Sequence, residues 1–193
     1  MSGAERIGDM RCRVGECPVW QPDEAALYWL DIEGRALWRW DPACAQASSR
    51  ALPERAGCMA ICAGGGWLLA METGLFHLPA WEAPAPERLA GVVHPLPQMR
   101  FNDGRCDRQG RFWAGTMLRD MSLAAPQGGL YRYTRADGLR RMLDGLIVPN
   151  GLAFSPDGRT MYLSDSHPSR RCIWSYDYDA DRGIPHARRL FAD

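Results

Sequence analysis

The sequence lacks any excess of charge, any long hydrophobic run and any recognisable leader. Its 23 basic and 23 acidic residues balance, so charge gives no reason to expect nucleic acid or an acidic membrane as a partner. No window of about 18 apolar residues occurs, which excludes a transmembrane helix. The first 20 residues also lack the apolar core of a secretory signal, about 7 to 15 residues long. We therefore expect a cytoplasmic protein with no nucleic-acid partner and no membrane partner.

Several motifs of catalytic or metal chemistry are also missing. The seven cysteines include no C-x-x-C pair, so they are expected to be small buried residues rather than disulfides or zinc ligands. The four histidines show no H-E-x-x-H spacing, which argues against a histidine zinc site. Asp165 and His167 suggest a catalytic pair, but no G-x-S-x-G motif supplies an activated serine. A serine hydrolase is therefore not expected.

Short aromatic runs beside turn residues are what the chain has instead. Its 8 tryptophans, 20 glycines and 14 prolines indicate many short strands and tight turns. In RALWRWDP (35–42), Ala36, Trp38 and Trp40 share one face, which is the period of two expected for a half-buried strand. Nothing sustains a helical period for three turns. The predicted fold class is all-β.

Four segments of the sequence follow one template and begin at residues 16, 58, 102 and 150. They read ECPVWQPDEAALYWLDI, CMAICAGGGWLLAMETG, NDGRCDRQGRFWAGTM and NGLAFSPDGRTMYLSDS. Repeats of about 40 to 50 residues with about four strands each are typical of β-propeller blades. We therefore expect residues 1–193 to form a single propeller domain of about four blades.

The first residues of these repeats could form an oxygen-rich ring. The first strand of a blade lies beside the central channel, so Glu16, Cys58, Asn102 and Asn150 would meet at one mouth. One carboxylate and two amide oxygens would make a partial cage for a hard cation, whereas Cys58 is more simply a packing residue. The alternative is that the asparagines only form turns and that Glu16 is a solvated edge residue.

Six stretches, in order over nearly the whole chain, carry a family resemblance. They are GECPVW, WLDIEGRALWRWDP, RFNDGRCDRQGRFWAGTM, GGLYRYTRADG, PNGLAFSPDGRTMYLSDS and IWSYDYDADRG. With them the chain resembles the SMP-30/gluconolactonase/LRE-like family, which includes regucalcin and bacterial sugar lactonases. The resemblance implies a six-bladed propeller with one divalent ion at the channel mouth, of which this chain would hold about four blades.

The resemblance also implies roles for five residues. Glu16 and Asn150 match the metal ligands of the family. Arg100 and Asn102 match residues that line the substrate pocket, with Asn102 close to the ion. Asp120 lies where many members have a glutamate that contacts substrate hydroxyls, and its shorter side chain puts that role in question.

The family further implies a metal-binding, catalytic aspartate in a P-D-G turn, which would lie beyond Asp193. The sequence is therefore expected to be truncated at its C-terminus, with an incomplete metal site and impaired activity. Blade edges that lack their neighbours would be open to self-association.

The activity that the resemblance implies is hydrolysis of a sugar-acid lactone, a small-molecule substrate. A divalent cation would polarise the lactone carbonyl and lower the pKa of a bound water. Calcium is favoured because the expected ligands are oxygens, while zinc, manganese and magnesium stay open. The alternatives are a non-catalytic metal- or sugar-binding propeller similar to regucalcin, an interaction propeller, or an inert fragment.

Overall fold

The computed structural model describes residues 3–193 and consists of four antiparallel sheets, each of four strands. The first sheet contains β1 (Gly15–Gln21), β2 (Ala26–Asp31), β3 (Ala36–Asp41) and β4 (Gln46–Ala51), and the second contains β5 (Ala56–Ile61), β6 (Trp67–Met71), β7 (Gly74–Leu78) and β8 (Glu87–Gly91). The third contains β9 (Met99–Cys106), β10 (Phe112–Leu118), β11 (Gly128–Thr134) and β12 (Gly138–Leu146), and the fourth contains β13 (Pro149–Phe154), β14 (Thr160–Asp165), β15 (Cys172–Asp179) and β16 (Ile184–Ala192). The all-β prediction is confirmed.

Two short 3-10 helices are the helical elements of the described chain. They are η1 (Pro22–Glu24), between β1 and β2, and η2 (Met121–Leu123), between β10 and β11. In residues 3–193, no helix is long and apolar enough to cross a membrane.

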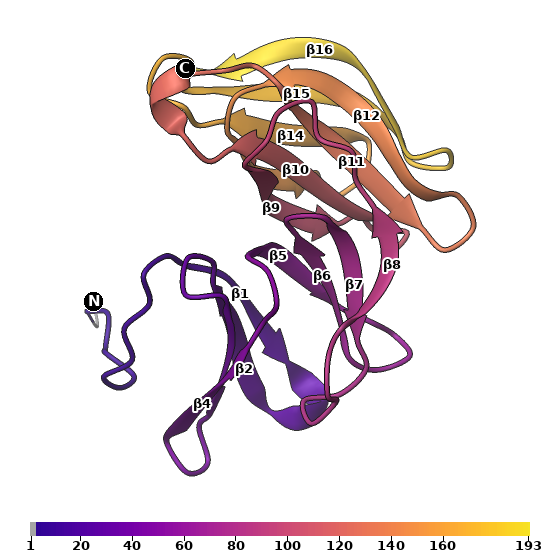
Figure 1. The fold of residues 1–193 in the computed structure, drawn as a ribbon. Coiled ribbons are helices and arrows are strands. Elements are labelled where there is room, and N and C mark those ends of the chain that lie inside the picture. Colours follow the sequence, from indigo (N-terminus) through magenta and orange to yellow (C-terminus); the bar gives the residue numbers. More distant parts are fainter. Residues whose placement is uncertain (1–2) are drawn as a thin grey trace.

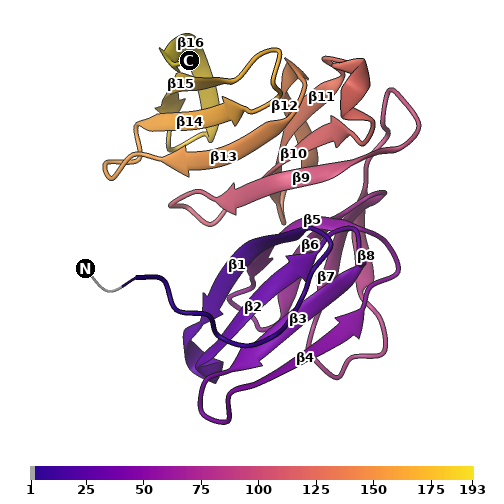
Figure 2. The ribbon, with the colours of Figure 1, turned by 90° about the vertical axis from the view of Figure 1, so that its left-hand side faces the viewer.

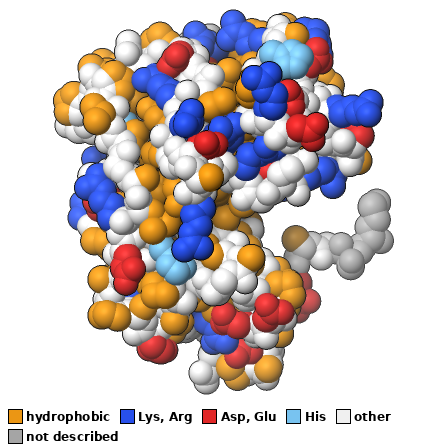
Figure 3. Space-filling view, turned by 90° about the vertical axis from the view of Figure 1, so that its right-hand side faces the viewer, with side chains coloured by type: hydrophobic (Ala, Val, Ile, Leu, Met, Phe, Trp, Pro, Cys, Tyr) orange, Lys and Arg blue, Asp and Glu red, His pale blue; other side chains and the backbone are white. Residues whose placement is uncertain are grey.

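Strands follow one another in chain order within every sheet, so each sheet is a simple meander. The first strands β1, β5, β9 and β13 are neighbours in that order, and they place the four sheets side by side in an arc (Figures 1 and 2). The sheets begin at Gly15, Ala56, Met99 and Pro149, one to three residues before the repeat starts seen in the sequence. The arc is open on one side, and the space-filling view shows a hollow between the upper and lower halves of the molecule (Figure 3).

The entry to each first strand and the end of each second strand lie at the same end of the arc, which we call the mouth. The chain therefore crosses the mouth with the turn after every second strand and with every link between sheets. The register that shows this pairs Gly15 with Asp31, Ala56 with Met71, Met99 with Leu118, and Pro149 with Asp165.

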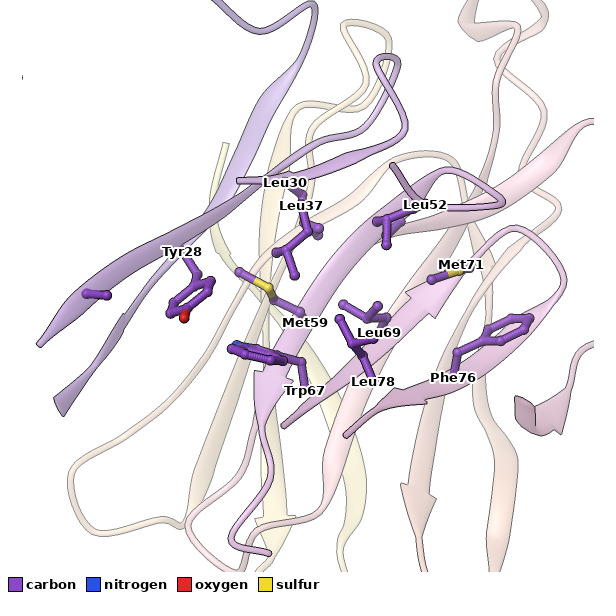
Figure 4. Packing of buried hydrophobic residues seen from close by; sticks show 12 residues of the cluster. Tyr28, Leu30, Leu37, Leu52, Met59, Trp67, Leu69, Met71, Phe76 and Leu78 are labelled. Carbon is purple, nitrogen blue, oxygen red and sulfur yellow. The ribbon is translucent and has the colours of Figure 1, made fainter. Parts of the chain in front are cut away.

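Hydrophobic side chains fill the space between neighbouring sheets. In the interface of the first two sheets, Tyr28, Leu30 and Leu37 pack against Trp67 and other residues of β5 to β7 (Figure 4). The Tyr28 and Trp67 rings lie 4.8 Å apart at 50°. Full burial of one such leucine contributes about 1.5–3 kcal/mol to folding, so contact between sheets stabilises every repeat. Similar clusters lie between the second and third sheets and between the third and fourth.

Strand β3 follows the alternation seen in RALWRWDP, with one difference in which face is buried more deeply. Leu37 is fully buried, whereas Trp38 is half-buried and stacks on Trp29 at 5.7 Å and 10°. The tryptophan face is therefore covered by a cross-strand aromatic pair rather than by the core.

Asp107 links the third sheet to the fourth through a buried hydrogen-bond network. Its carboxylate accepts hydrogen bonds from the Tyr178 hydroxyl and the Arg111 Nε, both at 2.5 Å. Arg111 also donates from Nη1 to the backbone oxygen of Asp181 at 3.1 Å. Burial alone would raise the pKa of Asp107, but these donors outweigh it and hold that pKa below its usual value.

Candidate functional site

A β-bulge interrupts each first strand just after its entry. Glu16 and Asn150 are equivalent by register, because each is the last paired residue before its bulge and lies opposite the penultimate residue of the second strand. Asn102 lies inside the bulge of β9, one residue later, and Cys58 follows the bulge of β5. The sequence prediction that all four share one phase is therefore wrong for Asn102 and Cys58, since bulges shift the alternation by a residue.

A small cavity brings the predicted oxygen donors together at the mouth. It measures about 10 Å³, and the residues that line it are Glu16, Ile32, Gly57, Asn102, Asp103 and Asn150. This volume is close to that of one water-sized sphere. We call this space the oxygen-donor cavity, because two carboxylates and two amides reach it.

Gly57 is the residue of the second sheet that lines this cavity, and Cys58 does not line it. A Cβ atom at Gly57 would collide with the backbone oxygens of Phe101 and Asn102, so β5 and β9 approach closely here. Cys58 is buried in the cluster between the second and third sheets, and burial raises the pKa of its thiol well above the usual value. The expectation that Cys58 is a packing residue is confirmed.

Asn102 is fixed by hydrogen bonds to both of its side-chain polar atoms. Its Oδ1 accepts from Nη1 of Arg100 at 2.8 Å, and its Nδ2 donates to the Pro149 oxygen at 3.0 Å. The Asn150 Oδ1 accepts from the neighbouring Gly151 amide at 2.9 Å. The amide of Asn102 therefore bridges the third sheet to the residue that precedes Asn150.

Asp103 is a residue of this site that the sequence analysis missed. Its Oδ2 accepts a hydrogen bond from the Leu152 amide at 3.3 Å, across the boundary between the third and fourth sheets. Simple alternation would direct consecutive residues of a strand to opposite faces, but the bulge lets both Asn102 and Asp103 line the cavity. Asp103 could have been identified only from the strand pairing that reveals the bulge, and the sequence does not show that pairing.

The side-chain oxygens that line the cavity are of the kind that binds a hard cation, but they are few. Carboxylate and amide oxygens are ligands that calcium takes, at six to eight per ion, whereas zinc prefers nitrogen and sulfur. Within residues 3–193, no three His, Cys, Asp or Glu side chains form a group that could hold a metal. By residue type, Glu16, Asp103, Asn102 and Asn150 are suited to supply part of the ligand set of a hard cation such as calcium.

Arg100 lies next to the oxygen-donor cavity, and Asp120 does not. Arg100 is only 8% exposed and also donates from Nη1 to the Phe101 oxygen at 2.9 Å. Asp120 is exposed, and its carboxylate caps η2 by accepting from the amide and hydroxyl of Ser122 at 3.1 and 2.6 Å. The structure thus brings four of the five predicted site residues together and leaves Asp120 on the neighbouring turn.

Asp165 and His167 do not form a pair with each other. Asp165 is fully buried and accepts from the Ile147 and Val148 amides at 3.0 and 2.8 Å. His167 contacts Ser169 through Nδ1 at 2.7 Å and the Met121 oxygen through Nε2 at 2.9 Å. Asp165 therefore anchors the backbone that enters β13, and His167 holds the turn that carries η2.

Asp31 performs the same anchoring role in the first sheet. Its carboxylate accepts from the amides of Arg13, Val14 and Gly34 at 3.0–3.1 Å. Burial alone would raise the pKa of Asp31, but the hydrogen bonds from Val14, Arg13 and Gly34 outweigh it and lower that pKa. The matching positions of Asp31 and Asp165 at the ends of two repeats were a signal in the sequence that could have found this role.

Comparison with known proteins agrees with this architecture. The family model described as "SMP-30/Gluconolactonase/LRE-like region" matches residues 14–193. The chain is 38% identical over 180 residues to a 6-deoxy-6-sulfogluconolactonase of Pseudomonas putida, covering 93% of this chain and 60% of that protein. It is 34% identical over 180 residues to the regucalcin of Xenopus laevis, covering 92% of this chain and 59% of that protein.

A solved structure gives the same picture. It is that of a calcium-binding protein, regucalcin, from Agrobacterium tumefaciens, with 26% identity, a TM-score of 0.86, and coverage of 96% of this chain and 61% of that one. The chain thus spans about 60% of the length of the curated relatives it matches. On the match over residues 14–193, the chain belongs to the SMP-30/gluconolactonase/LRE-like family.

Proposed function

We propose that this protein hydrolyses a sugar-acid lactone with the help of a divalent cation, for which calcium is the favoured ion. The observation that carries the proposal is the oxygen-donor cavity, where Glu16, Asp103 and two asparagines meet beside the buried Arg100. The Pseudomonas putida relative, a 6-deoxy-6-sulfogluconolactonase, supports the reaction class. The substrate is accordingly a small polar lactone.

In this proposal the oxygen donors of the cavity and the neighbouring Arg100 divide into two groups. Glu16, Asp103 and Asn150 hold the cation, which when bound supplies Lewis-acid polarisation of a carbonyl and a more acidic water. Arg100 and Asn102, fixed to each other by their hydrogen bond, orient the polar substituents of the lactone. Asp120 contacts the substrate only if the turn that η2 occupies moves, because its carboxylate is engaged with Ser122.

The reaction adds one water across the ester bond of the ring. The water oxygen bonds to the carbonyl carbon, the ring carbon–oxygen bond breaks, and the ring oxygen receives a proton to become a hydroxyl. The proton acceptor that the family resemblance implies is an aspartate. The residues of the cavity are therefore assigned to binding and orientation.

A continuous pH-stat assay of glucono-1,5-lactone opening by the full-length protein tests the proposal. The expected result is a rate above the spontaneous one that disappears with a calcium chelator and returns on addition of calcium. Asn150→Ala should lower the calcium affinity of the protein. A rate that is unaffected by chelator contradicts the metal-dependent mechanism.

A second candidate is a non-catalytic protein that binds calcium or a sugar acid. It is favoured by Asp120, whose carboxylate caps η2 and does not line the cavity, and by the regucalcin relatives. Titration calorimetry with calcium and gluconate distinguishes the two, because binding without lactone opening supports the second candidate.

A further inference from the structure

Four charged side chains surround Arg100 at the mouth, where turns of the first three sheets meet. Arg55 donates from Nε to Glu33 at 2.8 Å and from Nη1 to Glu72 at 3.0 Å. The Nη2 of Arg119 lies 3.7 Å from the same Glu33 carboxylate. We call Glu33, Arg55, Glu72, Arg100 and Arg119 the arginine cluster.

The charges of the arginine cluster do not balance. Three guanidinium groups face two carboxylates, and the hydrogen bonds of Arg100 go to two neutral oxygens, those of Phe101 and Asn102. Burial lowers the pKa of Arg100, Glu33 opposes that shift, and the like charges of Arg119 and Arg55 add to it. A buried cation that is incompletely paired is costly, and the five residues of the cluster carry one positive charge in excess.

Unused donors of the arginine cluster point in the same direction. The Nε atoms of Arg100 and Arg119 are both buried, and neither has a hydrogen-bond partner within the described residues 3–193. Buried polar groups are nearly always hydrogen-bonded, so each exception requires an explanation. The two Nε atoms themselves are closed to solvent, but the Arg119 side chain as a whole is 30% exposed, so part of it can meet a ligand from the solvent.

Asn102 connects the arginine cluster to the oxygen-donor cavity. It accepts a hydrogen bond from Arg100 and lines the cavity together with Glu16 and Asp103. The mouth is therefore polarised, with carboxylates on one side of Asn102 and guanidinium groups on the other. One ligand that carries an oxygen for a cation at one end and an anion at the other would match both sides.

We propose that the arginine cluster binds a sulfonate or phosphate group of the substrate, at a position remote from the lactone carbonyl, and that Arg119 determines this specificity. The inference rests on the proposed lactonase function. Both groups present several oxygens on one centre, which matches the planar fork of a guanidinium group. Glu33 and Glu72 hold Arg55 at 2.8 and 3.0 Å, whereas Arg119 lies at the longer distance of 3.7 Å from Glu33. Arg100 and Arg119 are therefore the arginines that we assign to the ligand.

Titration calorimetry with three open-chain acids tests the inference without turnover. The probes are gluconate, 6-phosphogluconate and 6-deoxy-6-sulfogluconate, each with the 193-residue chain in calcium buffer. Because a charge-assisted hydrogen bond contributes about 1.5–3 kcal/mol, at least one of the two 6-substituted acids should bind about ten-fold or more tighter than gluconate. The affinities also show whether sulfonate or phosphate is the preferred group.

Arg119→Gln should abolish this preference, and Arg119→Lys should retain part of it, since lysine keeps the charge and loses the fork. Arg35→Gln is the matched control, because Arg35 is an exposed arginine in the turn between β2 and β3 at the same mouth. It should leave the preference unchanged. Circular dichroism of each variant verifies its fold, and Arg119→Lys serves if Arg119→Gln does not fold.

Equal affinities for all three acids would overturn the inference, as would the same preference in Arg119→Gln and Arg35→Gln. The inference would also be overturned if none of the three acids binds. The lactone assay is separate, since lactone opening without preference for an anionic acid leaves the proposed function in place. Preference by this chain, without lactone opening by the full-length protein, supports the arginine cluster as an anion site and contradicts the lactonase function.

Discussion

The guanidinium of Arg100 donates to the Asn102 side-chain oxygen at 2.8 Å, and Asn102 in turn donates to the Pro149 oxygen at 3.0 Å. Pro149 directly precedes Asn150, so this chain of hydrogen bonds joins the third sheet to the first strand of the fourth. Both side chains lie at the oxygen-donor cavity or beside it. The contacts that connect two sheets thus also fix the orientation of the candidate site.

Asn102→Ala should destabilise the protein more than Asn150→Ala. Removing the Asn102 side chain deprives the buried Arg100 of one of its two hydrogen bonds and the Pro149 oxygen of its side-chain donor. The expected cost is about 1–3 kcal/mol. Asn150 loses only a bond to its own neighbour, Gly151, and serves as the control. Urea unfolding measures both, and equal losses would contradict a bridging role for Asn102.

Glu16→Gln should weaken calcium binding about ten-fold or more, because the amide keeps the shape of the side chain and removes its charge. Calorimetric titration with calcium measures the change. Glu87→Gln is the control, since Glu87 lies on the outer strand β8 and is exposed. If both variants bind calcium as the unmodified chain does, Glu16 is not a ligand.

Asp107→Asn should lower the free energy of unfolding by about 3 kcal/mol, because it leaves the Arg111 cation without its buried counter-charge. The Tyr178 hydroxyl would also lose a charged acceptor. Asp157→Asn is the control, since Asp157 occupies the corresponding turn of the fourth sheet and is exposed. A smaller loss for Asp107→Asn than for Asp157→Asn in urea unfolding would refute the role of this network.

Acid should destabilise the protein through Asp31 and Asp107. Both pKa values are lowered in the folded state, so their contribution is present above the unfolded pKa of about 3.9 and is lost as pH falls through the folded value. We expect the urea midpoint to fall steeply below about pH 4. Asp31→Asn should be less stable at pH 7 and should lose less between pH 6 and pH 3.

Asp23→Asn is the control for the pH series, because Asp23 is exposed in η1. Its stability should follow that of the unmodified chain across the whole range. A pH profile of Asp31→Asn that is parallel to that of the unmodified chain would remove Asp31 from this account.

Some features of the site could be predicted from the sequence because they depend on local pattern. Short aromatic runs between turn residues indicated strands, and the spacing of the four templates indicated four similar units. Glu16 and Asn150 could be matched because both precede a bulge at the same distance from the strand entry. Cys58 and Asn102 could not be matched to Glu16 and Asn150, because the bulges of β5 and β9 begin at different points of their strands.

The remaining features depend on contacts between residues far apart in the chain. Glu33, Arg55 and Arg119 lie in separate turns and meet because three sheets place those turns at one mouth. Asp120 lies next to Arg119 in the chain, yet the turn into η2 directs its carboxylate to Ser122. The sequence alone determined the strands, the repeat and three of the four oxygen donors, since periodicity and residue chemistry are local. Only the tertiary structure decided which charges converge, because pairing register and sheet packing set those distances.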